Sequence, residues 1–168
     1  GYHTLLSARL VGRQGVVIAV EPSRYAAEKL ANAIRENQLV QVRLERFGLG
    51  RENGVALLSR PAADNHTPTM LVDATKPHDS VDVFRLDDCV AKWGVETIDL
   101  LKLDVEGYEP AVLEGAAQLL RSKRIRAILC EFNRDWLSTA GCSSEKLYRQ
   151  IIAAGYRDAT PTIWNPLS

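Results

Sequence analysis

Apolar residues gather in short runs along the chain, and each run has the length of a β-strand. Residues 16–20 form a continuous apolar run, which is typical of a strand buried on both faces of a parallel sheet. Further strands are predicted at residues 41–46, 98–103 and 127–132. The sequence therefore predicts a sheet whose strands are mostly parallel.

Between these strands, apolar residues recur at the spacing of one helix face. One helix is predicted after Ser23, which suits an N-cap, a second starts at Pro110, and a third follows Ser143. Shorter helices are predicted at residues 4–10 and 86–93. Strands and helices that alternate with short connections form strand–helix–strand units, so the predicted fold is α/β with a doubly wound, mostly parallel sheet.

Residues 48–86 interrupt this alternation. The segment is rich in Gly, Pro, Asn and Asp, and its strand-like pieces are residues 55–59, 69–72 and 81–86. We expect irregular antiparallel strands here, lying over one end of the sheet. Because the sequence has no internal repeat and no low-complexity linker, residues 1–168 are predicted to form a single domain.

Charge balance narrows the expected partners. The chain has 168 residues with 21 Lys plus Arg and 21 Asp plus Glu, so its formal net charge is zero. A protein that binds a phosphate backbone usually carries a strongly basic surface, so nucleic acid is not an expected partner. A neutral small molecule or a glycan fits the balance better.

The cysteines and the apolar segments bear on location. Cys89, Cys130 and Cys142 form no CxxC pair, so reduced thiols in a cytoplasmic protein are expected, with Cys130 in the core. No apolar stretch approaches the ~18 residues of a membrane helix, and no secretory leader is visible, so no membrane partner is expected. The absence of an initiator Met suggests a trimmed chain.

Gly1 and Glu21 stand at positions where α/β proteins hold nucleoside cofactors, because ligands bind outside the carboxyl ends of parallel strands. Gly1 opens the first helix, and Glu21 ends the next strand twenty positions later. Both carboxylate oxygens of Glu21 can accept hydrogen bonds from ribose hydroxyls. Alternatively, Glu21 only favours the N-terminus of the following helix. The spacing by itself does not separate adenosylmethionine from a nicotinamide cofactor.

Asp104 and Glu106 follow the strand at residues 98–103 and form a second candidate group. In extended backbone, residues two apart point to the same side, and Gly107 lets the chain turn after them. We therefore expect both carboxylates at the ligand edge, where either can act as a general base. The alternative is that one caps the next helix and the other is solvated.

Other aromatic and titratable residues carry weaker signals. Phe47, just after the second predicted strand, either meets an adenine ring or is simply buried. The histidines are expected to be solvated or structural, and the tryptophans to belong to the core or to a lid; these residues are His3, His66, His78, Trp93, Trp136 and Trp164.

Several segments together resemble the FkbM-type methyltransferases. The similarity lies in residues 1–6, 17–23, 86–88, 101–109 and 112–116, and in Gly155-Tyr156, with the stretch Lys102-Leu-Asp-Val-Glu-Gly-Tyr-Glu109 the most specific. The resemblance implies a class I methyltransferase fold, S-adenosylmethionine as the donor, and O-methylation of a hydroxyl on a polyketide, sugar or related small molecule. Family members normally have a strand and an Asp-x-Gly-Ala-Asn-like loop before the position of Gly1, so the first strand and most of the glycine loop are expected to be missing here.

The resemblance implies that Glu21 binds the cofactor ribose and that Asp104 and Glu106 lie at the active-site edge. We therefore expect cofactor binding at Gly1, Glu21, Pro22, Phe47 and Asp104, catalysis by Asp104 and Glu106, and no metal. Two rival hypotheses are a nicotinamide-dependent oxidoreductase on a similar sheet and a non-catalytic domain of the same fold. The stretch around Asp104 and Glu106 argues against the first rival.

Overall fold

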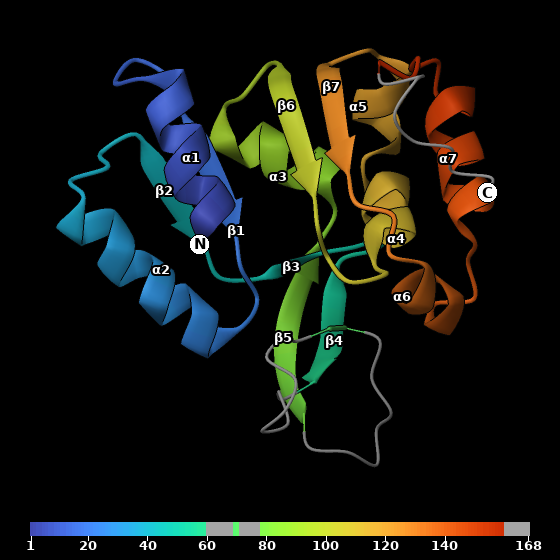
Figure 1. The fold of residues 1–168 in the computed structure, drawn as a ribbon, viewed down its shortest axis with the longest axis horizontal. Helices are drawn as coiled ribbons and strands as arrows, with labels where there is room; N and C mark the ends of the chain where they lie inside the picture. Colours follow the sequence, from blue (N-terminus) through green and yellow to red (C-terminus); the bar gives the residue numbers. More distant parts are fainter. Residues whose placement is uncertain (60–68, 71–77, 160–168) are drawn as a thin grey trace.

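Pairs of strands with helices packed on them make up the fold in Figure 1. The structure is a computed structural model and describes residues 1–59, 69–70 and 78–159. Over most of these ranges strands alternate with helices. The predicted mixed α/β class is therefore confirmed.

Two parallel strand pairs form where the sequence predicts strands. β1 (Val17–Val20) pairs with β2 (Val42–Glu45), and β6 (Ile98–Leu103) pairs with β7 (Ile125–Cys130). Each pair is connected through helical segments, because parallel neighbours need a crossover rather than a tight turn. All four strands point the same way in Figure 1, so their carboxyl ends lie at one end of the molecule.

The strands do not join into the single doubly wound sheet that the sequence predicts. Those in the described residues form three separate sheets, which are β1–β2, β6–β7 and a third of mixed direction. In Figure 1, β1 and β6 are the strands on the facing sides of the two parallel pairs. No described strand bridges them, so the parallel pairing is confirmed and the continuity of the sheet is not.

The third sheet lies beyond the carboxyl ends of the parallel strands (Figure 1). β4 (Gly54–Ser59) runs antiparallel to β5 (His78–Phe84), which confirms the predicted excursion of strands. β3 (Gly48–Leu49) pairs in parallel with β5 and was not predicted. Of the predicted piece at 69–72, residues 69 and 70 are not in a strand, and residues 71 and 72 lie outside the described residues.

Side-chain caps fix the starts of several helices. Ser23 and Ser143 accept hydrogen bonds from the amides of Ala26 and Lys146, as the sequence predicts for N-caps. Asn133 caps a further helix that the sequence analysis missed. The helices are α1 (Tyr2–Val11), α2 (Arg24–Glu36), α3 (Leu86–Trp93), α4 (Glu109–Gly115), α5 (Ala117–Arg121), α6 (Arg134–Thr139) and α7 (Ser144–Ala153).

The main hydrophobic core covers one face of the β6–β7 pair. The opposite face is open, since Leu100 and Leu129 are 54% and 53% exposed. Cys130, expected in the core, is half-buried and packs against the core cluster. The buried cluster consists of Leu86, Val90, Leu101, Leu103, Val112, Leu113, Ala116, Leu119, Leu120, Ile125, Leu137 and Leu147.

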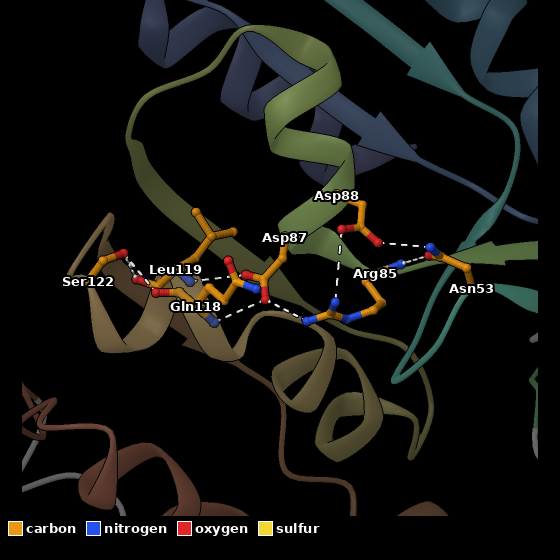
Figure 2. Close-up of polar contacts among 7 residues, drawn as sticks. All are labelled: Asn53, Arg85, Asp87, Asp88, Gln118, Leu119 and Ser122. Atoms are coloured by element: carbon orange, nitrogen blue, oxygen red, sulfur yellow. Dashed lines mark hydrogen bonds and ion pairs between the residues drawn. The ribbon is translucent and has the colours of Figure 1, made fainter.

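The helix predicted from Pro110 is divided into α4 and α5, and Asp87 supports the second part (Figure 2). The Asp87 carboxylate accepts hydrogen bonds from the backbone amides of Gln118 and Leu119, both at 3.0 Å. These are amides of the first turn of α5, which have no partner inside the helix. Arg85 donates a third hydrogen bond to Asp87, also at 3.0 Å. Asp87 therefore ties α3 to α5.

Asp88, the next residue, makes a more exposed set of contacts (Figure 2). Its carboxylate accepts a hydrogen bond of 2.8 Å from the side-chain amide of Asn53, which also accepts one from the backbone of Arg85. The Asp88 side chain is 40% exposed, whereas that of Asp87 is 4% exposed. The two neighbouring acids thus differ in burial and provide a matched pair for mutation.

We expect Asp87→Ala to lower the free energy of unfolding by about 2–3 kcal/mol, because two backbone amides and Arg85 lose their acceptor. Asp88→Ala, the control, should cost less than about 1 kcal/mol because its contacts are exposed. Urea unfolding followed by circular dichroism measures both. Equal losses for the two variants would show that Asp87 does not support the α4–α5 junction.

Candidate functional site

Residues that are distant in the sequence meet at the carboxyl ends of β1 and β6. Glu21 follows β1, Asp104 follows β6, and Gly1 precedes α1. The backbone nitrogen of Gly1 lies near the Glu21 carboxylate, and His3 lowers the pKa of Asp104. The start of α1 therefore lies close to both strand ends.

The two carboxylate oxygens of Glu21 differ in their hydrogen bonding. Oε1 accepts a hydrogen bond of 2.9 Å from the backbone amide of Ser23, the N-cap of α2. Oε2 has no hydrogen-bond donor among the residues that the structure describes. Burial raises the pKa of Glu21, and the Ser23 hydrogen bond only partly offsets it. Glu21 thus contacts the start of α2, as the alternative interpretation predicts, and its second oxygen is still available to a ligand.

The backbone after β6 turns instead of staying extended. Glu106 has φ 51° and Gly107 has φ 90°, both in the left-handed region. The premise that Asp104 and Glu106 lie in extended backbone is therefore wrong. Their side chains are still close enough for the charge of Asp104 to raise the pKa of Glu106.

Two contacts hold Glu106 in this unfavourable conformation. Thr69 donates a hydrogen bond of 3.1 Å to its backbone carbonyl, and Trp136 of α6 lies close enough to its carboxylate to lower the pKa of Glu106. Burial is the largest cause of the raised pKa of Glu106, followed by the charges of Asp104 and Glu109. A non-glycine residue in the left-handed region costs on the order of 1–3 kcal/mol, and such residues are enriched at functional sites.

Glu109 stabilises the same turn, and the sequence analysis gave it no separate role. It is 2% exposed, and its Oε1 accepts a hydrogen bond of 3.0 Å from the backbone amide of Val105. Its second oxygen is buried with no hydrogen-bond partner among the described residues. Glu109 therefore stabilises the turn through Oε1, while Oε2 is a buried hydrogen-bond acceptor without a donor among the described residues.

Glu131 is the main site residue that the sequence analysis missed. Leu103 of β6 is in register with Cys130 of β7, and the amide of Glu131 donates a hydrogen bond of 3.0 Å to the Leu103 carbonyl. The next residues along the strands, Asp104 and Glu131, are therefore neighbours. The predicted strand ran to residue 132, which placed Glu131 inside it rather than at its carboxyl end.

The side chains of Asp104 and Glu131 are hydrogen-bonded to each other. This contact, with burial and the negative charges of Asp104 and Glu106, raises the pKa of Glu131 to about 7. The same contact lowers the pKa of Asp104, and Lys102, whose Nζ lies 2.6 Å from Oδ2 of Asp104, lowers it further. Below about pH 7 the two carboxyl groups thus hold one proton between them, mainly on Glu131.

Phe47 lies in an aromatic group close to the strand ends. It meets Phe84 edge-on at 5.0 Å and stacks on Trp93 at 6.4 Å between ring centroids. The indole nitrogen of Trp93 donates a hydrogen bond of 3.1 Å to Glu45. These contacts account for Phe47 as a packed residue, and its contact with adenine stays a prediction.

The remaining sequence candidates fall in different places. Pro22 lies in the turn between β1 and α2, beside Glu21. His78 begins β5, while His66 and Trp164 lie outside the described residues.

In residues 1–59, 69–70 and 78–159, no group of three His, Cys, Asp or Glu side chains is placed to hold a metal ion. No helix in these ranges is long and apolar enough to cross a membrane.

Because the contact with Asp104 raises the pKa of Glu131, we expect the free energy of unfolding to depend on pH. The pKa of Glu131 is about 7 in the folded chain, against an ordinary value of 4.5, so folding binds a proton between these values. The free energy of unfolding should therefore fall as the pH rises from about 4.5 to about 7. The lowered pKa of Asp104 acts only below its ordinary value of 3.8, outside this window.

Urea unfolding at about pH 5 and pH 8 tests this. The wild type should be less stable at the higher pH, and Glu131→Gln should lose less stability between the two, since its amide is neutral at both. The same pH dependence in both proteins would contradict the shared proton.

Comparison with solved structures supports the fold. The chain is similar to methyltransferase FkbM from Methylobacillus flagellatus KT, with a TM-score of 0.56 and 17% sequence identity over 83% of this chain. The match covers 30% of that protein's chain, so the present chain spans less than a third of its length. No curated protein matches the chain.

Comparison with protein families covers more of the sequence. A family model described as the methyltransferase FkbM domain matches residues 1–157. This range includes every segment on which the predicted resemblance rests, and it includes Gly1, Glu21, Asp104, Glu106 and Glu131. The resemblance is confirmed, and the chain belongs to the FkbM methyltransferase domain family.

Proposed function

We propose that this chain is the S-adenosylmethionine-dependent part of a methyltransferase that methylates a hydroxyl group of a neutral small molecule, polyketide or sugar. One observation carries the proposal: the start of α1 lies near Glu21, at the carboxyl end of β1, and near Asp104, which follows β6 and is close to Glu106. Ligands bind at this edge in open α/β sheets. Family membership supplies the type of reaction, since FkbM methyltransferases generally use S-adenosylmethionine.

The residues at this edge fit a nucleoside cofactor with an amino-acid tail. Oε2 of Glu21 is available to a ribose hydroxyl, with Pro22 beside it and Phe47 as the candidate for the adenine. The start of α1 has no side-chain cap and no acidic residue in its first turn, so its amides can bind a carboxylate. The bound cofactor would supply a methyl group already activated on a sulfonium.

The protein's main task in such a transfer is to align the acceptor oxygen with the methyl carbon. The turn at Asp104–Gly107 suits this task because Glu109, Thr69 and Trp136 hold it in one conformation. Asp104 is the candidate for orienting the cofactor, and Glu106 for the acceptor side. A carboxyl group at this edge would accept the proton that the hydroxyl loses.

We further propose that a parallel strand between β1 and β6 completes the sheet and brings the glycine loop to Gly1. β1 and β6 have no common partner strand among the described residues. α1 presents an exposed stripe of Tyr2, Leu6 and Leu10, which are 72%, 40% and 77% exposed. Together with the open face of β6–β7, this stripe leaves apolar surface that a further layer would cover.

Calorimetric titration with S-adenosylhomocysteine, with NAD as the comparison, tests the cofactor assignment. We expect S-adenosylhomocysteine to bind and NAD not to bind. Glu21→Gln should weaken binding by about 1.5–3 kcal/mol, because a ribose hydroxyl loses a charged acceptor. Glu36→Gln, on the exposed end of α2, is the matched control and should leave the affinity unchanged.

Two results would contradict the assignment. Binding of NAD in preference to S-adenosylhomocysteine would favour the oxidoreductase. A melting temperature that collapses in Glu21→Gln, with an unchanged affinity per folded molecule, would leave Glu21 only its contact with Ser23.

An extended chain tests the completed sheet. With a strand and a glycine loop added before Gly1, the affinity for S-adenosylhomocysteine should rise strongly, because loop amides would then meet the cofactor's carboxylate. Aggregation should fall as the open strand edges become paired. Equal affinities of the two chains would show that the added strand contributes nothing to the site.

A further inference from the structure

We propose that Glu131 is the base that takes the proton of the acceptor hydroxyl, with Asp104 and Lys102 holding it in place. The inference rests on the proposed methyl transfer and names the group that makes the acceptor oxygen nucleophilic. Neither the sequence motifs nor the family comparison assigns a role to Glu131.

The position of Glu131 follows from the pairing of β6 and β7. The backbone bond from the Glu131 amide to the Leu103 carbonyl extends the parallel ladder by one residue beyond Cys130. Glu131 is therefore fixed at the carboxyl end of β7, beside Asp104 at the end of β6. Its side chain is exposed, so an incoming ligand can reach it.

Two carboxyl groups in hydrogen-bond contact cannot both be ionised without a large repulsion, so the pair keeps one proton until the pH is near neutral. Lys102 decides which group carries the charge, because its ammonium lies 2.6 Å from Asp104 and forms an ion pair with it. The proton therefore resides on Glu131, and the pKa of Glu131 is raised to about 7. A base with a pKa near the working pH is the most effective kind.

The other acids at this edge are less suited to the role. Lys102 and Glu131 stabilise the ionised form of Asp104, which makes it a weak base. Glu106 is half-buried, and Trp136 beside its carboxylate favours the ionised form. Glu106 is therefore better placed to bind the acceptor than to take its proton.

The proton and the electrons balance in the proposed step. The acceptor oxygen forms a bond to the methyl carbon while the carbon–sulfur bond breaks and its electron pair stays on sulfur. The hydroxyl proton passes to the Glu131 carboxylate and from there to solvent. No oxidant or reductant is needed.

Charged residues that follow or belong to β6, together with His3 of α1, affect the pKa values of Asp104 and Glu131. Asp104 and Glu106 raise the pKa of Glu131, and Lys102 lowers it. His3 at the start of α1 acts on Asp104. Removing the carboxylate of Asp104 should therefore change the titration of Glu131 most, and removing that of Glu106 should change it less.

Carbon-13 NMR of the glutamate carboxyl groups, assigned with Glu131→Gln, measures this titration in the chain as it is. The wild-type Glu131 carboxyl should titrate near pH 7. In Asp104→Asn its midpoint should fall toward the ordinary glutamate range, since the new amide donates to the ionised form. Glu106→Gln, the matched control, should lower it only slightly. A wild-type midpoint in the ordinary range, or no change in Asp104→Asn, would overturn the proposal.

A second arm uses sinefungin, which carries an amine at the place of the transferred methyl. When sinefungin is bound, its ammonium should lower the midpoint of Glu131, whereas S-adenosylhomocysteine should leave the midpoint near 7. If both ligands bind and neither moves it, Glu131 lies away from the methyl and is not the base. If neither ligand binds, the proposed function fails and the base assignment falls with it, while the titration still reports whether the pair shares a proton.

Discussion

The parallel register of β6 and β7 determines where the acidic side chains of the site lie. Leu103 is paired with Cys130, so the residues that follow, Asp104 and Glu131, emerge side by side. The pairing is held from one side only, by a core in which Leu101, Leu103 and Ile125 are buried. A shift of one residue would turn the buried residues of β6 toward the open face and separate the two carboxyl groups.

Polar contacts then fix the conformation of the turn that follows β6. Glu109 holds the amide of Val105, Thr69 donates a hydrogen bond to the carbonyl of the left-handed Glu106, and Trp136 lies beside the Glu106 carboxylate. These contacts come from α4, from α6 and from Thr69. The turn therefore depends on packing by elements that are far apart in the sequence, and Asp87 secures the next junction along the chain, between α4 and α5.

Much of the fold follows from local pattern, and the site follows from it only in part. The apolar run at residues 16–20 and the caps Ser23 and Ser143 predicted elements correctly, because runs and caps act within a few residues. Glu131 was missed because its role depends on which strand lies beside β7. Glu106 was misplaced in extended backbone because the left-handed turn is imposed by distant partners.

The division of the sheet could not be predicted from the strands themselves. The sequences of β1 and β6 predict strands of a parallel sheet, but nothing in them says whether the two strands belong to one continuous sheet. The same limit applies to the cofactor. The spacing of Gly1 and Glu21 suits more than one nucleoside, and only the match to the FkbM domain over residues 1–157 supplies the class of reaction.

In the proposed function, the carboxyl ends of β1, β6 and β7 and the start of α1 form one cofactor and acceptor site. The most direct test is a nitrogen-15 NMR titration of the chain with S-adenosylhomocysteine, with perturbed amides mapped on the fold. We expect the largest changes at residues 2–3, 21–24 and 104–107. Changes concentrated at the opposite ends of the strands, around residues 14–16 and 122–126, would contradict it.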